Sequence, residues 1–246
     1  MEGRKKPKIS KEEFLVLLKY VEGEGWEDLA SRYTFPLEEV DCSTIEHGYF
    51  WRAISRHQQL SEQFIERYQD KVSWRKISFY QKLSEEFIEK YQDRLDWCNI
   101  SERQKLSESF IERHQDEVDW EEISRHQKLS ESFIEKFKGK VDWEGISKCQ
   151  ELSEPFIEKF KDKVDWEYIS AYQRLSEPFI EKYQDKVNWE CISKYQRLSP
   201  EFVAKHIDKI TKKIFENPCY KDLPDSLKLL LEQKFKRRYE DDDEEV

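Results

Sequence analysis

The chain has 246 residues, of which 39% are charged and 37% hydrophobic, and its formal net charge is −10. The mean hydropathy is −0.97, and the absence of any apolar run near the roughly 20 residues that span a bilayer excludes a membrane-spanning helix. Such hydropathy is typical of disordered chains, but the 14% of aromatic residues is too many for that class. An elongated repeat array, with a thin core and a large surface, satisfies both observations.

The first segment, residues 1–48, is predicted to be a degenerate repeat that caps the array. Its basic start, MEGRKKPKISKEE, is followed by no apolar stretch, so a secretory signal is not expected. Ser10, Phe14 and Trp26 then occupy roughly the positions at which a helix cap, a phenyl ring and an indole recur later in the chain.

Residues 49–210 contain seven repeats of 23 residues. After the tryptophan of each repeat come Ile, Ser and Gln at the third, fourth and seventh positions, Leu-Ser at the ninth and tenth, and Phe at the thirteenth. We expect the indole and phenyl rings to form the core that joins successive repeats. These residues are Trp51, Trp74, Trp97, Trp120, Trp143, Trp166 and Trp189, with Phe64, Phe87, Phe110, Phe133, Phe156, Phe179 and Phe202.

Two short helices are predicted in every repeat. The serine at the tenth position is a favourable N-cap, and Pro155, Pro178 and Pro200 fall in the first turn after it, where the missing proline N–H does no harm. A second helix is predicted to begin at each tryptophan, and in six of the seven repeats a favourable N-cap residue precedes it: Asp, Asn or, before Trp74, Ser73. Because helices this short are marginal in isolation, each repeat must bury its apolar face against its neighbours. The expected fold class is all-α, an α-solenoid of two-helix repeats.

Residues 211–239 are predicted to form a C-terminal capping helix region. Leu227, Leu230, Leu231 and Phe235 fall on one face of the expected helix, which would cover the last repeat as solenoid caps do. The remaining residues, 240–246 (EDDDEEV), are expected to be a solvated acidic tail.

The repeat motif LSExFIEKYxDKVDWxxISxYQ, carried by residues 49–210, resembles tandem repeats in proteins of large DNA viruses, including giant amoeba viruses. The resemblance implies a repeat type but no activity, because the function of those proteins is mostly unassigned. It also implies a viral protein located in the host cytoplasm or the virion. The segments before and after the repeats depart from the motif.

The repeated polar residues have a functional and a structural interpretation. A row of glutamines could contact a ligand, but we favour amides that bind the backbone of an inter-helix turn or of an adjacent repeat, because buried polar groups are normally paired. The serine at the fourth position is expected to allow close helix approach or to bind the preceding turn. A row of serine nucleophiles is disfavoured, because no histidine recurs at a fixed offset as a base.

Histidine and cysteine indicate neither a metal site nor a cofactor. His57 and His126 share the sixth position after tryptophan with tyrosines, and His114 and His206 share the seventeenth with Tyr or Phe. Both positions are therefore interpreted as packing positions. The five cysteines have no ligand spacing, which favours a reducing cytoplasm. We see no catalytic constellation and expect a non-enzymatic chain, with an activity in the irregular ends as a weaker alternative.

The expected function is the binding of a protein partner by a monomeric scaffold, with no membrane involved. The positions one, two, five, six and eight residues after each tryptophan vary, so the surface can specialise while the core is constant. Phe79, Arg103, Arg125, Tyr168 and Tyr172 are the predicted contact residues, because aromatic and arginine side chains dominate interface energetics. For each of them, an ordinary exposed residue is the alternative interpretation.

Association with nucleic acid, or mimicry of it by the acidic tail, is the alternative function. The best basic clusters are at residues 205–213 (KHIDKITKK) and 234–238 (KFKRR). A typical repeat is negatively charged, since residues 83–105 hold six acids and four bases, and phosphate binding requires a cationic surface. The rings, if buried, are also not available to stack on bases.

Overall fold

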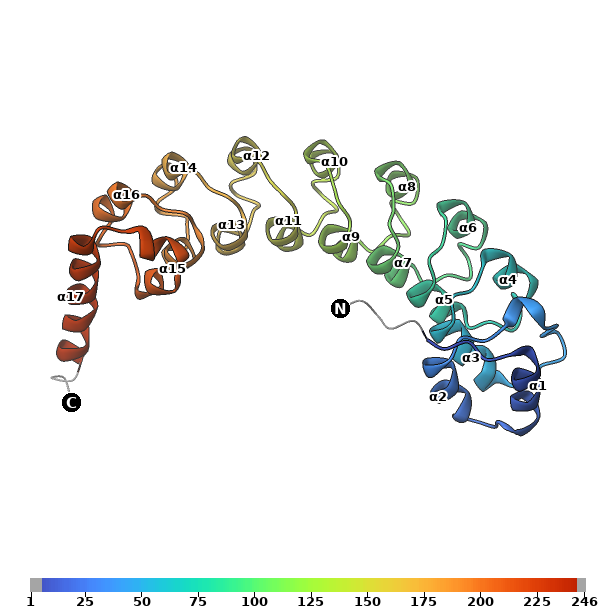
Figure 1. Cartoon of the computed structure of the whole chain (residues 1–246). Helices are drawn as coiled ribbons and strands as arrows, with labels where there is room; N and C mark the ends of the chain where they lie inside the picture. The colour runs from blue at the N-terminus through green and yellow to red at the C-terminus, as the bar shows by residue number, and fades with distance from the viewer. Residues whose placement is uncertain (1–5, 243–246) are drawn as a thin grey trace. The chain divides into compact units, whose positions relative to one another are not determined.

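The computed structural model describes the backbone of residues 6–242 and the side chains of residues 6–236. Over this range the chain is all-α, with seventeen α-helices, three 3-10 helices and one isolated bridge between Lys8 and Thr34 (Figure 1). None of the described helices combines the length and the apolar character needed to cross a membrane. The chain divides into two compact units, Met1–Gln127 and Lys128–Val246. Within each unit helix pairs pack in a row, which is the architecture of an α-solenoid.

The first unit consists of two kinds of helix. Those that carry the tryptophans, termed Trp helices, are α2 Gly25–Arg32, α3 Gly48–His57, α5 Trp74–Tyr80, α7 Trp97–Arg103 and α9 Trp120–His126. The others are α1 Lys11–Tyr20, the 3-10 helix η1 Leu37–Glu39, and the Phe helices α4 Glu62–Arg67, α6 Glu85–Lys90 and α8 Glu108–Arg113. Each Trp helix contacts the next one along the chain, and the Phe helices form a second layer beside them (Figure 1).

The second unit repeats this arrangement and ends in a different structure. Its Trp helices are α11 Trp143–Cys149, α13 Trp166–Tyr172 and α15 Trp189–Tyr195, and its Phe helices are α10 Glu131–Lys136, α12 Glu154–Lys159, α14 Glu177–Lys182 and α16 Pro200–Lys205. The chain continues as η2 Lys212–Glu216, η3 Pro218–Asp222 and α17 Asp225–Asp242. The row of Trp helices ends where α15 packs on η2.

The capping region differs from the sequence-based expectation in one leucine. Leu227 and Leu231 are buried, but Leu230 is 48% exposed. The acidic residues 240–246 have no described side chains, so the prediction of a solvated tail lies outside the described part of the chain.

The predicted helix caps are present, with one exception. In each Phe helix the N-cap serine accepts a hydrogen bond from the phenylalanine N–H, as Ser84 does from Phe87 at 3.1 Å. Proline lies in the first turn of α12, α14 and α16. Asp119 caps α9 by accepting from Glu121 and Glu122, whereas the side chain of Ser73 makes no capping bond to α5.

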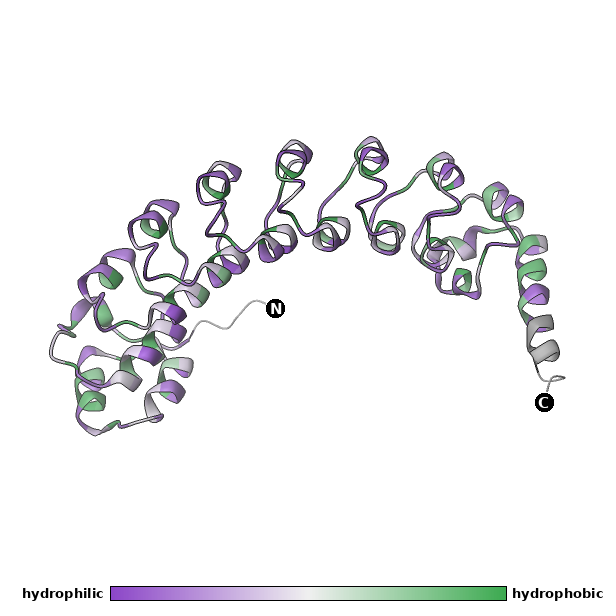
Figure 2. Ribbon diagram, turned by 180° about the vertical axis from the view of Figure 1, so that it is seen from behind, coloured by the Kyte–Doolittle hydropathy of each residue, from purple (hydrophilic) through white to green (hydrophobic). Residues whose placement is uncertain are grey.

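The core is formed by aliphatic and phenyl side chains on opposing faces of the two layers. Every short helix carries both hydrophobic and hydrophilic residues (Figure 2). The isoleucine at the third position, such as Ile100, and the aliphatic residue after the phenylalanine, such as Ile111, are fully buried. The seven phenylalanines of the Phe helices are also buried, with Phe133 only 5% exposed.

Within each compact unit, the repeated glutamine connects a repeat to the one before it. Gln81 Nε2 donates to the carbonyls of Ser55 and Gln58 at 2.9 and 2.8 Å, and its Oε1 accepts from the Leu60 N–H at 3.0 Å. The two carbonyls belong to the end of the preceding Trp helix, where no intrahelical partner exists. Gln104, Gln127, Gln173 and Gln196 make the same three contacts. The structural interpretation of this residue is therefore confirmed.

The glutamine contacts continue into both irregular ends. Gln58 donates to the carbonyls of Ala30 and Tyr33 and accepts from the Phe35 N–H, so α2 and the residues after it act as a repeat. At the other end, Asn217 Nδ2 donates to the carbonyls of Ser193 and Gln196. A shorter amide thus closes the series.

The serine at the fourth position links the Trp helix of one repeat to the Trp helix of the next. Ser78 Oγ donates to the Trp74 carbonyl at 2.8 Å and accepts from the Asp96 N–H at 3.0 Å. Asp96 is the N-cap of the next Trp helix. The predicted bond to the preceding turn is confirmed, and the same hydroxyl also fixes the start of α7.

The tryptophans lie less deeply than the sequence suggested. Trp51 is 3% exposed, but Trp74, Trp97, Trp120, Trp143, Trp166 and Trp189 are only half-buried. Trp166 packs on Phe179 and Tyr183, with centroid separations of 6.4 and 5.1 Å, while the Lys186 ammonium lies 5.9 Å from its ring. Its Nε1 donates to the Lys161 carbonyl. These six indoles therefore lie at the edge of the core and not inside it, which corrects the expectation of buried rings. The cation contact does not by itself set this depth, since Lys71 lies equally far, 5.9 Å, from the buried Trp51 ring.

The seventeenth position is a packing position, as expected. His206 packs on Trp189 and Phe202, with centroid separations of 5.5 and 4.4 Å. Burial lowers the pKa of the His206 imidazole below its ordinary value of 6.5, because a buried site disfavours the charged form. The folded chain therefore disfavours protonation of this ring relative to water.

We predict that Gln104→Leu lowers the free energy of unfolding by about 3 kcal/mol, because three buried backbone groups lose their partner. Urea unfolding followed by circular dichroism measures the change. Gln59→Leu, at an exposed position, serves as the matched control and should change stability by less than about 0.5 kcal/mol. Equal losses in the two variants would contradict the role assigned to the repeated amide.

We also predict that His206→Phe removes part of the acid sensitivity of the fold. A histidine with a lowered folded pKa contributes a loss of stability that begins as pH falls through the unfolded value and is complete below the folded one. Between about pH 7 and pH 5 the parent chain should therefore lose more stability than the variant. Thermal melts across this range test it, and parallel curves for the two proteins would refute it.

Candidate interaction surface

The variable positions of the repeat lie on the outer face of the Trp helices. The second, fifth and sixth residues after tryptophan are separated by three and four positions, so they share one helical face. The third, fourth and seventh residues, by contrast, are buried and hold the repeats together. Because successive Trp helices pack side by side within each unit, their outer residues form a continuous row.

Five residues of the first unit form a cation–aromatic cluster across three Trp helices: Arg56 of α3, Lys76, Phe79 and Tyr80 of α5, and Arg103 of α7. The Phe79 and Tyr80 rings lie 4.6 Å apart. The Arg103 guanidinium is 4.1 Å from the Phe79 centroid. Arg56 and Lys76 lie 5.4 and 5.6 Å from the Tyr80 centroid. The structure therefore brings together the predicted residues Phe79 and Arg103.

Two carboxylates border this cluster. Arg56 Nη1 donates to Glu27 at 2.7 Å, and His57 Nε2 lies 2.9 Å from the same oxygen. Burial alone would raise the pKa of Glu27, but these hydrogen bonds outweigh it and lower the pKa. Arg103 pairs with Glu102 at 3.0 Å. Both arginines are thus held in place while their side chains remain 38% and 46% exposed.

The predicted residue Arg125 has a different environment. Its guanidinium forms an ion pair with Glu121, one turn earlier on α9, at 2.6 Å. An ion pair between exposed side chains on one helix contributes little to stability. Arg125 lies on the same outer face as the cluster, two Trp helices beyond α5.

The predicted tyrosines of the second unit also lie together. The rings of Tyr168 and Tyr172 on α13 are 6.1 Å apart, and the Lys148 ammonium of α11 lies 5.2 Å from the Tyr168 centroid. The negative charge of Glu144, whose carboxylate accepts from the Tyr168 hydroxyl at 3.4 Å, raises the pKa of that hydroxyl. Tyr172 is 59% exposed.

The sixth position after tryptophan is an exposed position and not a packing one. Tyr80, Tyr172 and Tyr195 are 41%, 59% and 55% exposed, which corrects the interpretation drawn from their exchange with histidine. Three members of the cluster, Arg56, Lys76 and Tyr80, were not predicted as contact residues. The sequence did contain a signal for a cationic surface at this place, because the segments 51–59 and 74–82 contain no acidic residue.

The basic segments suggested for nucleic acid are engaged within the chain. Lys205 pairs with Glu181, Lys209 lies 5.4 Å from the Trp189 ring, and Lys213 pairs with Glu216. Lys234 donates to the carbonyls of Ile207 and Ile210. The side chains at 237 and 238 lie outside the described residues.

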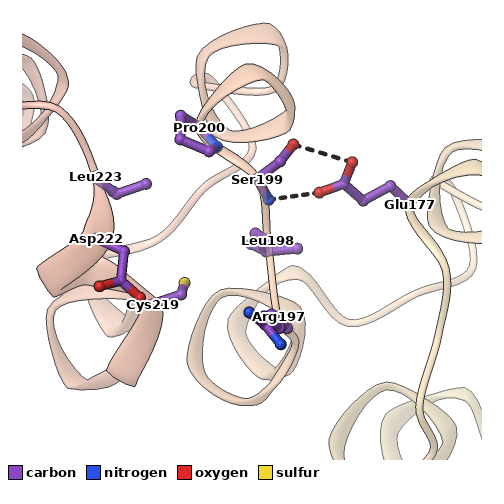
Figure 3. Close-up of a pocket in the computed structure, with 8 residues that line it drawn as sticks. All are labelled: Glu177, Arg197, Leu198, Ser199, Pro200, Cys219, Asp222 and Leu223. Atoms are coloured by element: carbon purple, nitrogen blue, oxygen red, sulfur yellow. Dashed lines mark hydrogen bonds between the residues drawn. The ribbon is translucent and has the colours of Figure 1, made fainter.

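A shallow pocket of about 390 Å³ lies where the last Phe helix meets the C-terminal cap (Figure 3). The Glu177 carboxylate accepts from the N–H and the hydroxyl of Ser199, so both of its oxygens are engaged. Burial raises the pKa of the Cys219 thiol, which disfavours the nucleophilic thiolate. The other lining residues are Arg197, Leu198, Pro200, Asp222 and Leu223.

Among the described residues, no group of three or more His, Cys, Asp or Glu side chains is placed to hold a metal ion.

No protein-family model, curated protein or solved structure matches this chain. The resemblance to viral repeat proteins therefore stays a prediction from the motif.

We predict that Phe79 and Arg103 are energetically coupled. A double-mutant cycle with Phe79→Leu and Arg103→Gln should give a coupling of about 0.5–1 kcal/mol, the usual range for an exposed cation–π contact. Urea unfolding of the four proteins measures it. A cycle that combines Phe79→Leu with Arg113→Gln on α8 should give less than about 0.5 kcal/mol, as for residues without a shared contact. Equal coupling in both cycles would show that the contact is not specific.

Proposed function

We propose that this chain is a non-enzymatic repeat scaffold that binds a protein partner through the outer face of its Trp helices. The observation that carries the proposal is that structural contacts and sequence variation fall at different positions of the repeat. Constant residues make the contacts between repeats, whereas the variable positions gather exposed aromatic and cationic side chains at two places, around Phe79 and around Tyr168. Clusters of this composition are typical of the residues that dominate protein interfaces.

The Phe-helix layer supports this choice of face, because its charges serve the stacking of repeats. Glu62 accepts from the Ser84 N–H of the next repeat at 2.6 Å, and Lys90 pairs with Glu66 of the preceding one at 2.7 Å. Similar ion pairs connect α10 with α12 and α12 with α14. The side chains on the outer face of the Trp helices make fewer ion pairs and hydrogen bonds between repeats, so this face is the better candidate for binding a partner.

The proposed setting is cytoplasmic, and the proposed state is a monomer with neither a cofactor nor a membrane partner. All five cysteines are free, which supports a reducing compartment. The motif resemblance supports a viral protein that acts in the host cytoplasm or within a virion.

Association with nucleic acid is the second candidate, and one observation favours it. Cations are concentrated on the outer face of the first unit, where Arg52, Arg75 and Lys82 add to the cluster. A cationic strip can bind the phosphate backbone of a nucleic acid. The acidic tail, or mimicry by it, is the other form of this proposal.

Affinity capture with the full chain from source cells, followed by quantitative mass spectrometry, tests the proposal. Phe79→Glu or Tyr168→Glu should reduce the yield of a specific protein by at least about tenfold, as the loss of an interface hot spot does. The matched control is Gln63→Glu, at an exposed position of α4, and it should leave the yield unchanged.

Two outcomes would contradict the protein-binding scaffold. Identical captured proteins with all four chains would show that the outer face is not the binding surface. Loss of the captured proteins on nuclease treatment would favour the nucleic-acid candidate.

A further inference from the structure

The positive charge of the first unit is concentrated on the outer face of α3, α5 and α7. The nine-residue segments that begin at Trp51, Trp74 and Trp97 together hold seven Lys or Arg residues and one acid, Glu102. The corresponding segments of the second unit each hold an acidic residue directly after the tryptophan. The cationic character therefore belongs to one part of the repeat array, although the chain as a whole carries a charge of −10.

The aromatic rings of the cluster hold its cations in place. Arg103 lies over the face of Phe79 at 4.1 Å, and its Nη2 pairs with Glu102 at 3.0 Å, yet its side chain remains 46% exposed and can reach a further acceptor. Tyr80 is flanked by Arg56 and Lys76. A guanidinium positioned by stacking is suited to bidentate binding of a carboxylate.

Several of these cations have no acidic partner. Among the residues with described side chains, Arg52, Arg75 and Lys76 form no ion pair, while Arg56 and Arg103 each have one carboxylate. Arg52 and Arg75 are exposed and Lys76 is half-buried. The surface thus presents more positive charge than its own residues neutralise.

We propose that the cation–aromatic cluster of α3, α5 and α7 is a docking site for an acidic peptide segment of the partner protein. This inference rests on the proposed function and adds the chemistry of the partner. Carboxylates of the segment would bind the Arg103 guanidinium and the Lys76 ammonium, and the positive charge of Arg56, which already donates to Glu27, would add to the attraction. The exposed edge of Tyr80 would pack against the aliphatic part of the bound chain.

The cluster fits a peptide better than a nucleic acid. The face of Phe79 is covered by Arg103, and that of Tyr80 is approached by two cations, so neither ring is free to stack on a base. Glu27 and Glu102 border the cluster at 2.7 and 3.0 Å from its arginines and would repel a long polyanion. A short acidic segment can bind between them.

Fluorescence anisotropy with the full chain tests the proposal. The probe is a short labelled peptide in which Asp and Glu alternate with Ser, used at low salt, where exposed charges are least screened. The parent chain should bind it and should not bind the same peptide with Asn and Gln. Lys76→Glu and Arg103→Glu should weaken binding by at least about tenfold, and Lys76→Gln should have a smaller effect.

The matched control is Arg67→Glu, which makes the same charge change at an exposed position of α4 in the other layer. Its affinity should stay within about twofold of the parent chain, because the substitution lies outside the docking site. Equal weakening by Arg67→Glu would overturn the proposal in favour of general electrostatic attraction. Equal binding of the amide peptide, or tighter binding of a single-stranded oligonucleotide of the same charge, would also overturn it.

The failure of this inference differs from the failure of the proposed function. If the acidic peptide does not bind but affinity capture still depends on Tyr168, the docking chemistry is wrong and the scaffold proposal stands. If capture depends on neither Phe79 nor Tyr168, the scaffold proposal itself fails.

Discussion

Within each compact unit, a repeat is connected to the preceding one by a buried amide that satisfies three backbone groups at once. Helices of six or seven residues leave most of their terminal carbonyls without an intrahelical partner, and burial of such groups is costly unless they are paired. The Gln104 amide supplies that pairing for the end of α5 and the turn after it. The short helices can be buried because this contact recurs at a fixed spacing, and the solenoid depends on it.

The aromatic residues of the repeat have two different roles. The phenylalanines fill the space between the two layers, whereas most tryptophans lie at its edge, with one face on aromatic neighbours. A lysine or arginine lies over the indole, as Lys186 does over Trp166. The same chemistry occurs on the outer face, where Arg103 covers Phe79. Stacking of cations on rings therefore stabilises the array in one place and prepares a charged surface in another.

The sequence allowed the fold, the caps and the role of the glutamine to be predicted, because these depend on local spacing and on the pairing of buried polar groups. The depth of Trp166 could not be predicted, since it depends on how the neighbouring segments pack around its ring and not on local spacing. The exchange of His and Tyr also had two meanings. At His206 the exchange marks a packing position, whereas at Tyr172 it marks an exposed one. Residue type alone does not distinguish the two cases. The cation–aromatic cluster could be predicted only in part. Phe79 and Arg103 were chosen by residue type, but Arg56 contacts Tyr80 only because α3 packs against α5.

The uniformity of the glutamine contacts has a genetic consequence. An in-frame duplication or deletion of one 23-residue repeat preserves the glutamine contacts at the new junction, because they join a constant side chain to backbone groups that every repeat supplies. Such a chain can therefore gain or lose repeats by recombination, and the glutamine contacts need no compensating substitutions. Asn217 sets the boundary of this process, since its Oδ1 accepts from the nearby Cys219 N–H, and a copy inserted after it would meet no free amide oxygen.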